Sequence, residues 1–308
     1  MAVRVSETRP KGAPVPAAAQ QSAHQTLTAR LRAAGCVFAE DEARLLIDAA
    51  QTPEALEAMA RSRISGLPLE HILGWAEFCG LRIAVTSGVF VPRRRTEFLV
   101  RQAAAVLDAW RMAILHQDNG HTGSPRPHGQ GGDPAADTTP VVVDLCCGSG
   151  AVGAALAALS GPVELHAADI DPLAAACARR NVEPLGGAVH EGDLYTPLPG
   201  RLRGRVRVLA VNAPYVPSAD IGTMPPEARL HEPRACLDGG ADGLEVQRRV
   251  AAGALQWLAP GGELLIETSR RQASRTAGIL RSHGLAVRIL KSEELGATVV
   301  AGTRAFSG

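Results

Sequence analysis

The stretch VVVDLCCGSGAVGAAL, from Val141 to Leu156, decides the fold of this chain. An apolar run containing one acidic residue passes through a glycine turn and continues with the small and apolar residues of a helix. Glycine lets the backbone turn tightly and approach a ligand, because no Cβ intervenes. Gly148 and Gly150 occupy the positions of close approach, and Gly153 lets the new helix pack near the strand. The stretch therefore predicts a strand, a ligand-binding turn and a helix, as in open α/β sheets.

After Val141 the chain alternates strand patterns with helix patterns. Such alternation predicts a mostly parallel sheet with helices on both faces. The last two expected strands, 285–290 and 297–305, have no long helix between them and should pair antiparallel, as in methyltransferase sheets rather than dehydrogenase sheets. The expected fold class is therefore α/β, with a Rossmann-like sheet whose last strand is antiparallel. The other expected strands are 141–145, 163–169, 188–192, 206–212 and 263–269, and the expected helices between them are 151–160, 171–181 and 242–258.

Ahead of this sheet the sequence predicts a helical region and a hairpin. Amphipathic segments that end at Gly35 and Gly66 predict three or four short helices, one of them capped by Thr52. The runs FCGLRIAV and GVFVP, separated by Thr86-Ser87-Gly88, predict a β-hairpin that turns there. The expected organisation is a disordered tail over 1–21, a helical substrate-recognition domain over 22–76, a hairpin linker over 77–92 and a methyltransferase domain over 93–308 with a flexible insertion at 117–140.

Composition narrows the class of protein. The formal net charge is +1, which disfavours a protein whose main task is to bind nucleic-acid phosphates. No apolar run is long enough to span a membrane, and the N-terminus lacks the apolar segment of a signal peptide. The six cysteines show no CxxC spacing and the nine histidines are scattered, so no metal site is expected. We expect a cytoplasmic protein with reduced thiols and no membrane partner.

Acidic residues after the next strands predict the kind of cofactor. Asp169 ends the second strand, where a carboxylate can accept both hydroxyls of a ribose, which fits NAD and S-adenosylmethionine equally. Asp193 and Leu194 follow the third strand and could flank an adenine. Together with the turn after the fourth strand they fit only S-adenosylmethionine. Asp144 is expected to orient the loop and the amino group of the cofactor. The expected cofactor-binding residues are Asp144, Cys146, Cys147, Gly148, Ser149, Gly150, Asp169, Asp193, Leu194 and Asn212.

The fourth strand runs into an unusual turn within VLAVNAPYVPS, residues 208–218. Asn212-Ala213-Pro214-Tyr215 differs by one letter from Asn-Pro-Pro-Tyr, a motif of enzymes that methylate planar nitrogens. Such a nitrogen is a poor nucleophile because its lone pair is delocalised, and a site helps by accepting hydrogen bonds from both of its N–H groups. The acceptors are the Asn212 side-chain oxygen and the main-chain carbonyl of Ala213, which alanine has as proline would. Tyr215 can cover the planar group, and Pro214 keeps Ala213 extended. These four residues are the expected catalytic residues.

From about residue 25 to 305 the chain resembles the bacterial protein-(glutamine-N5) methyltransferases, which modify class I peptide-chain release factors. The resemblance rests on the helical N-terminal region and on the order and spacing of VFVPRRRTEFLV, VVDLCCGSGAVGAALA, AADIDPLAAACARRN, VNAPYVP, RLHEPRACLDGGADGLE and LAPGGELLIE. It implies S-adenosylmethionine-dependent methylation of the glutamine in a Gly-Gly-Gln tripeptide. It also implies cofactor contacts at Cys146 to Gly150, Asp169, Leu194 and Asn212, and a glutamine-binding turn from Asn212 to Tyr215.

Three departures distinguish the chain from the family pattern. Ala213 replaces a proline, and Cys146 and Cys147 replace small residues. Arg94 and Arg95 replace a proline and an acid. The retained Arg93 and Glu97 are expected to anchor the cofactor-side helix, and Glu232 to shape the substrate-side loop. The three consecutive arginines could instead contact phosphate or form a solvated face. The departures leave open a side branch with another glutamine-bearing protein as its substrate.

Two other functions stay open from the sequence. The same turn could methylate the amino group of a flipped adenine in DNA or RNA, although the near-neutral charge and the lack of a basic recognition domain count against it. The chain could also be a binding module that keeps the cofactor fold without catalysis, against which the retained Asn212, Pro214 and Tyr215 argue. We therefore expect an enzyme with a protein substrate, a monomer without a direct nucleic-acid partner.

Overall fold

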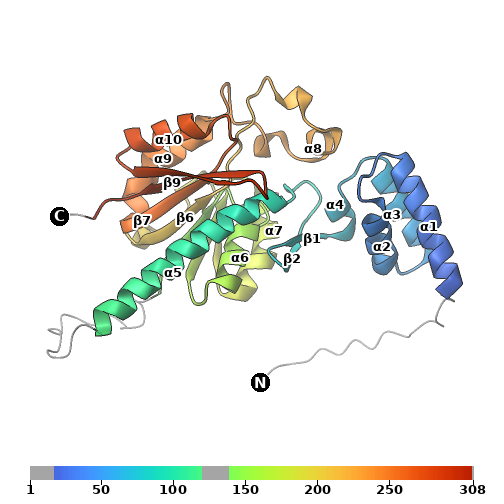
Figure 1. The fold of residues 1–308 in the computed structure, drawn as a ribbon, viewed down its shortest axis with the longest axis horizontal. Helices are drawn as coiled ribbons and strands as arrows, with labels where there is room; N and C mark the ends of the chain where they lie inside the picture. Colours follow the sequence, from blue (N-terminus) through green and yellow to red (C-terminus); the bar gives the residue numbers. More distant parts are fainter. Residues whose placement is uncertain (1–16, 120–138, 307–308) are drawn as a thin grey trace. The chain divides into compact units, whose positions relative to one another are not determined.

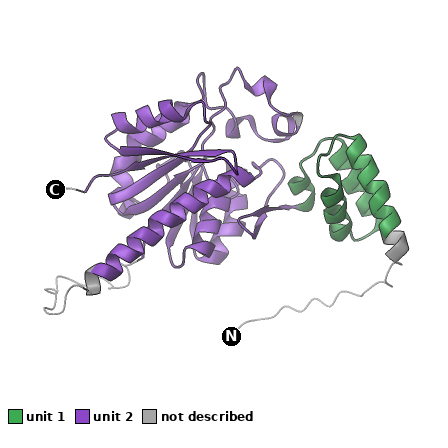
Figure 2. Ribbon diagram, in the orientation of Figure 1, with its two compact units in different colours: residues 1–73 green, residues 74–308 purple. Residues whose placement is uncertain are grey.

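The computed structural model describes residues 17–119 and 139–306, which divide into two compact units (Figure 1, Figure 2). The division falls between Leu73 and Gly74, so the segment expected as a hairpin linker belongs to the larger unit. The expected disordered tail, as far as residue 16, and the part of the expected flexible insertion from 120 to 138 lie outside the described residues. Within the described residues, no helix is both long and apolar enough to cross a membrane.

Helices alone form the described part of the smaller unit. Its core gathers leucines and alanines, with Leu31 and Leu46 fully buried. The hydroxyl of Thr52 accepts a hydrogen bond from the backbone N–H of Ala55 at 3.1 Å, which is the expected N-cap. The first helix begins five residues earlier than expected, because the run AAAQQ at 17–21 consists of good helix formers. The helices are α1 (Ala17–Ala33), α2 (Ala39–Ala49), α3 (Pro53–Ile64) and α4 (Leu69–Leu73).

The larger unit begins with a two-stranded hairpin, β1 (Trp75–Phe78) and β2 (Leu81–Ala84). Its turn lies at Cys79-Gly80, so the expected turn at 86–88 was wrong. Both turn residues have positive φ, 52° and 74°, as the tightest hairpin turns require. Asn181 holds the second strand to the rest of the unit, because its side chain accepts from the N–H of Ala84 at 2.8 Å and donates to its carbonyl at 2.9 Å.

The main sheet has seven strands in the order β5-β4-β3-β6-β7-β9-β8, which confirms the expected α/β class. The first five strands of this order are parallel, and β9 runs antiparallel to both of its neighbours. The expected final hairpin is therefore present. The strands are β3 (Val141–Leu145), β4 (Glu164–Asp169), β5 (Ala188–Glu191), β6 (Val206–Val211), β7 (Leu258–Glu267), β8 (Ala286–Ser292) and β9 (Ala297–Thr303).

Helices cover both faces of this sheet (Figure 1). On one face Val142 and Val208 pack with residues of the three helices α5, α6 and α7, and on the other Val143 and Leu209 pack with residues of α9 and α10. Alternate residues of each central strand thus enter opposite cores, which is why β3 and β6 are apolar except at Asp144 and Arg207. The helices of this unit are α5 (Glu97–Asn119), α6 (Ala151–Leu159), α7 (Pro172–Val182), α8 (Pro226–His231), α9 (Glu245–Trp257) and α10 (Ala273–Ser282).

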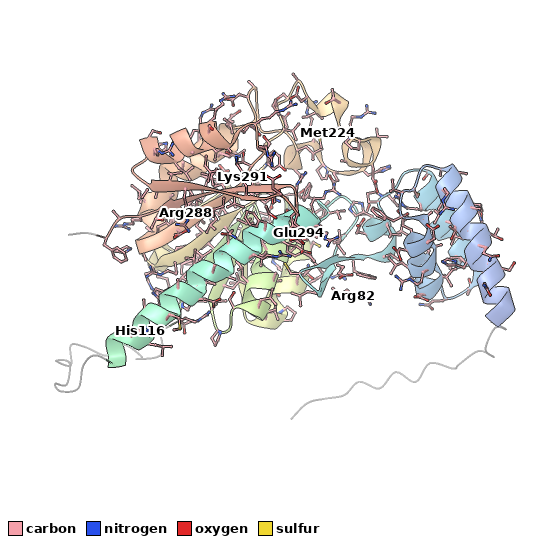
Figure 3. All side chains as sticks on the ribbon, in the orientation of Figure 1. Arg82, His116, Met224, Arg288, Lys291 and Glu294 are labelled. Atoms are coloured by element: carbon pink, nitrogen blue, oxygen red, sulfur yellow. The ribbon has the colours of Figure 1, made fainter. Side chains whose placement is uncertain are left out.

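One strand of the sheet starts earlier than expected, and the edge strand β8 carries charged side chains. β7 starts at Leu258, five residues before the expected start, because Gly262 allows the chain to run close beside β6: a Cβ there would lie 2.5 Å from the carbonyl oxygen of Val206. The edge strand β8 carries Arg288 and Lys291, both labelled in Figure 3. Charged side chains on an edge strand discourage pairing with another chain.

Candidate active site

A cavity of about 300 Å³ lies within the larger unit, at the carboxyl ends of β3, β4 and β6. In open α/β sheets this edge is where ligands bind. Met224, labelled in Figure 3, reaches the wall from the segment before α8. The wall contains every expected site residue except Gly150, namely Asp144, Cys146, Cys147, Gly148, Ser149, Asp169, Asp193, Leu194, Asn212, Ala213, Pro214 and Tyr215.

The glycines after β3 serve different purposes. A Cβ on Gly148, whose φ is 55°, would meet no atom within 4 Å, so this residue borders open space at the cavity. A Cβ on Gly150 would lie 2.8 Å from Cγ2 of Val182, so this glycine serves the packing of α6 against α7. Gly150 is not at the wall of the cavity, so its expected close approach to a ligand stays a prediction. A Cβ on Gly153 would lie 3.1 Å from Leu165 on β4 and 3.2 Å from the carboxylate of Asp144 on β3, so this glycine lets α6 pack close to both strands.

Asp169 joins the glycine loop to β4. Its carboxylate accepts hydrogen bonds from the backbone N–H groups of Gly148 at 2.8 Å and Asp171 at 2.9 Å. Burial raises the pKa of Asp169, and these two N–H groups oppose the shift. The residue thus holds the loop in place while its side chain lines the cavity.

Asp144 is a deeply buried acidic residue at the cavity. It is 2 % exposed and accepts a hydrogen bond from the N–H of Gly153 at 2.8 Å, at the start of α6. Burial raises its pKa to about 8. This contact orients the first turn of the helix relative to β3.

The segment after β5 is held by α9. Asp193 forms an ion pair with Arg249, and the hydroxyl of Tyr195 donates to the carbonyl of Val250 at 2.7 Å. Between them, Leu194 has a φ of 47°, a conformation that residues other than glycine adopt only when their surroundings hold them there. These contacts place Asp193 and Leu194 at the wall of the cavity.

The turn after β6 is fixed by contacts from several elements. Asn212 donates from Nδ2 to the hydroxyl oxygen of Thr96 at 3.4 Å, and Ala213 is buried. The carbonyl of Tyr215 accepts from Nε2 of Gln272 at 2.9 Å. Gly243 allows this close arrangement, since a Cβ there would lie 2.3 Å from the Tyr215 carbonyl oxygen. Burial raises the pKa of the Tyr215 hydroxyl to about 12, so this group stays protonated near neutral pH.

Two of the three consecutive arginines pair with buried carboxylates. Arg93 pairs at 2.6 Å with Glu232, whose side chain is fully buried, and Arg95 pairs at 3.2 Å with Glu267, whose side chain is 3 % exposed. Both arginines line the cavity. Glu97 accepts from the backbone N–H of Cys79 at 3.2 Å and so ties the start of α5 to the hairpin turn.

Sequence reasoning did not single out Thr96, Glu267, Gln272 or Arg249, all of which hold wall residues in place. Glu267 was the easiest of these to find, because it is the acidic residue that ends the strand next to β6, where Asn212 also leaves the sheet. The contacts of the other three depend on how α5, α9 and α10 pack, which no local pattern reveals.

Comparison with known proteins shows what this arrangement resembles. The model of the family described as Methyltransferase small domain matches residues 134–219. A release factor glutamine methyltransferase of Geobacter sulfurreducens is 35% identical over 237 residues, which cover 75% of this chain and 72% of the relative. One from Bradyrhizobium diazoefficiens is 31% identical over 285 residues, covering 87% and 88%. A 4-amino-L-phenylalanine/4-methylamino-L-phenylalanine methyltransferase of Streptomyces pristinaespiralis is 32% identical over 224 residues, covering 73% and 68%.

The sheet and the cavity at its carboxyl edge define an S-adenosylmethionine-dependent methyltransferase. The residues at the wall fit that cofactor, because the Asp169 carboxylate offers an acceptor for hydroxyl groups and Gly148 borders open space. Within this class, the chain belongs to the family of release factor glutamine methyltransferases, as the sequence resemblance implied.

Proposed function

We propose that this enzyme transfers a methyl group from S-adenosylmethionine to the side-chain amide nitrogen of a protein glutamine, that of the Gly-Gly-Gln tripeptide in a class I peptide-chain release factor. The observation that carries the proposal is the turn from Asn212 to Tyr215, which borders the same cavity as Asp169 and the glycine loop. The release factor glutamine methyltransferases of Geobacter sulfurreducens and Bradyrhizobium diazoefficiens, to which the chain is similar, support the choice of substrate.

Cofactor binding would use the wall residues that the sequence singled out. Asp169 would accept hydrogen bonds from the ribose hydroxyls, and Asp193 and Leu194 would flank the adenine. The backbone from Cys146 to Ser149 would lie against the cofactor, with Gly148 at the closest approach because a Cβ is absent there. Asp144 would orient the loop and the cofactor's amino group. Asn212 would border the cofactor as well as the glutamine.

The turn would activate the amide by orienting it. When bound, the cofactor supplies an electrophilic methyl group. The Asn212 side-chain oxygen and the Ala213 carbonyl would accept hydrogen bonds from the two N–H groups of the glutamine, which holds its nitrogen lone pair toward the donor. The ring of Tyr215 would cover the planar amide. No general base is needed before transfer, because the methylated nitrogen loses its proton readily. Alanine supplies the same carbonyl as proline, so Ala213 preserves this chemistry.

We also propose that the enzyme acts in the cytoplasm, where release factors work, and that it acts as a monomer on a protein, without nucleic-acid or membrane partners. The near-neutral net charge supports a substrate other than nucleic acid.

The test is transfer of radiolabelled methyl from S-adenosylmethionine to an unmodified class I release factor. We expect label on the release factor with the wild-type enzyme, and loss of label with the Asn212→Ala enzyme or with a Gly-Gly-Gln to Gly-Gly-Ala release factor. Separate reactions contain DNA, RNA, host lysate and 4-amino-L-phenylalanine. Label in one of these but not on the release factor would overturn the proposed substrate, as would label that survives in the Gly-Gly-Ala protein.

A further inference from the structure

We propose that Asn181 is a positioning residue, which holds the glycine loop in the shape that receives S-adenosylmethionine and ties this loop to the hairpin of β1 and β2. Asn181 lies on α7 and is not at the wall of the cavity, so it acts on the cofactor through Ser149, which is at the wall. This inference rests on the proposed function, because it concerns how the proposed cofactor site keeps its shape.

The side-chain amide of Asn181 contacts two segments that are far apart in the sequence. Its oxygen accepts from the backbone N–H of Ala84 at 2.8 Å. Its nitrogen donates to the carbonyl of Ala84 at 2.9 Å and to the carbonyl of Ser149 at 2.8 Å. Only the oxygen of an amide can accept from an N–H group. The N–H of Ala84 therefore fixes the orientation of the amide, with its nitrogen toward the two carbonyl oxygens.

The glycine loop needs such a contact because glycines stand on both sides of Ser149. Gly148 and Gly150 have φ angles of 55° and 74°, and glycine adopts positive and negative φ about equally readily. The peptide unit between Ser149 and Gly150 is held at both ends. Its carbonyl accepts from Asn181, and its N–H donates to the carbonyl of Cys147 at 2.8 Å. Since a peptide unit is planar, these two hydrogen bonds together fix its orientation.

Asp169 is a second anchor of the same loop. Its carboxylate accepts from the N–H of Gly148 at 2.8 Å. Asp169 and Asn181 thus hold the two peptide units that flank the one between Gly148 and Ser149, and both of these loop residues line the cavity. A cofactor that lies against this backbone meets a loop that is already ordered, which lowers the cost of binding.

The contact with Ala84 connects the loop to the hairpin. Ala84 ends β2, and Phe78, which ends the partner strand β1, lines the cavity. Cys177, four residues before Asn181 on α7, also donates from Sγ to the carbonyl of Ala84, at 3.2 Å. Asn181 therefore holds both the hairpin and the loop, whereas this contact of Cys177 holds the hairpin alone. Cys177→Ala is accordingly the matched control for the loop contact.

Calorimetric titration with S-adenosylmethionine tests the inference. We expect Asn181→Ala and Asn181→Asp to raise the Kd on the order of 10-fold, because neither variant can donate to the Ser149 carbonyl and the loop must then be ordered on binding. Cys177→Ala should leave the Kd within about twofold of the wild-type value. An unchanged Kd in both Asn181 variants would overturn the inference, as would an equal loss of affinity in Cys177→Ala.

A measurement on the wild-type protein does not depend on whether the variants fold. The chain has three asparagines, Asn119, Asn181 and Asn212, so labelling with ¹⁵N-asparagine yields few side-chain NH₂ signals. Asn119→Ala and Asn212→Ala identify two of the pairs, which leaves the third to Asn181. We expect the Asn181 signals to move when S-adenosylmethionine is added, although this residue is not at the wall. Asn181 signals that stay in place while the cofactor binds would overturn the inference.

Kinetics with the methyl acceptor separate a role in cofactor binding from general damage to the enzyme. In the Asn181 variants the KM for S-adenosylmethionine should rise while kcat stays near the wild-type value, because Asn181 contacts the loop and the hairpin rather than the Asn212 turn. A lower kcat with an unchanged KM would overturn the inference. A wild-type enzyme that binds the cofactor but does not methylate the release factor would instead refute the proposed substrate, and the Kd values and NMR spectra would still decide the role of Asn181.

Discussion

Exchanging one of two neighbouring glycines for alanine separates a packing role from a ligand role. Gly148 and Gly150 both have positive φ, 55° and 74°, which costs an alanine about 1–2 kcal/mol at either position. At Gly150 the new Cβ would also lie 2.8 Å from Val182 and 3.1 Å from Ala178, and such overpacking adds about 1–3 kcal/mol. Gly150→Ala should therefore destabilise the larger unit by about 2–5 kcal/mol, and Gly148→Ala by about 1–2 kcal/mol.

Cofactor affinity should change in the opposite order. A Cβ at Gly148 enters open space at the cavity, where it would meet the cofactor, and overpacking of about 1–3 kcal/mol weakens binding on the order of 10- to 100-fold. Gly150→Ala should leave the affinity of the folded protein nearly unchanged, because Gly150 is not at the wall.

Two measurements check this pair of variants. Urea unfolding can be followed by tryptophan fluorescence, which reports on the larger unit alone because Trp75, Trp110 and Trp257 all lie in it. Calorimetric titration gives the Kd of S-adenosylmethionine. Equal losses of stability in the two variants, or a loss of affinity confined to Gly150→Ala, would refute the assignment of the two glycines.

Three further predictions concern the cavity. Asp169→Asn should weaken S-adenosylmethionine binding on the order of 10- to 100-fold, because hydrogen bonds to a charged group are worth about 1.5–3 kcal/mol, and an unchanged calorimetric Kd would contradict a ribose contact. Ala213→Pro should keep methyl transfer and raise the free energy of unfolding by about 0.4–1 kcal/mol, so a loss of activity would show that alanine is required. Asp144 has a native pKa of about 8, above its unfolded value, so the native state holds the proton more tightly and stability should fall as pH rises toward 8. Asp144→Asn should make the free energy of unfolding, measured by urea titration at several pH values, depend less on pH. An unaltered pH dependence would contradict the raised pKa of Asp144.

Much of the fold was predictable because its signals are local and repeated. The apolar runs of β3 and β6, each with a single charged residue, identify strands buried on both faces, and the short connection between β8 and β9 predicts their antiparallel pairing. The hairpin was misplaced because its turn uses Cys79 at positive φ, a position where glycine or asparagine is the usual signal. The early start of β7 depends on Gly262 lying against β6, which is a tertiary contact rather than a local pattern.

For the site, as for the fold, residues in local sequence patterns were predictable and those that depend on tertiary contacts were not. Residues that end or directly follow parallel strands, such as Asp169 and Asn212, were predictable because the parallel strands bring their carboxyl ends to one edge of the sheet. The role of Gly150 was not, since its neighbour Val182 comes from another helix. Thr96 and Glu267 lie 116 and 52 residues in sequence from the side chains they contact, Asn212 and Tyr215, so only the packed structure brings these pairs together.

The most direct test of the central claim is to locate the transferred methyl group by tandem mass spectrometry. The release factor is treated with the enzyme and S-adenosylmethionine, digested, and the peptide containing Gly-Gly-Gln is fragmented. We predict one added methyl group on the side-chain nitrogen of that glutamine with the wild-type enzyme and none with Asn212→Ala. A methyl group on any other residue, or an unmodified Gly-Gly-Gln peptide with an enzyme that binds the cofactor, would contradict the account.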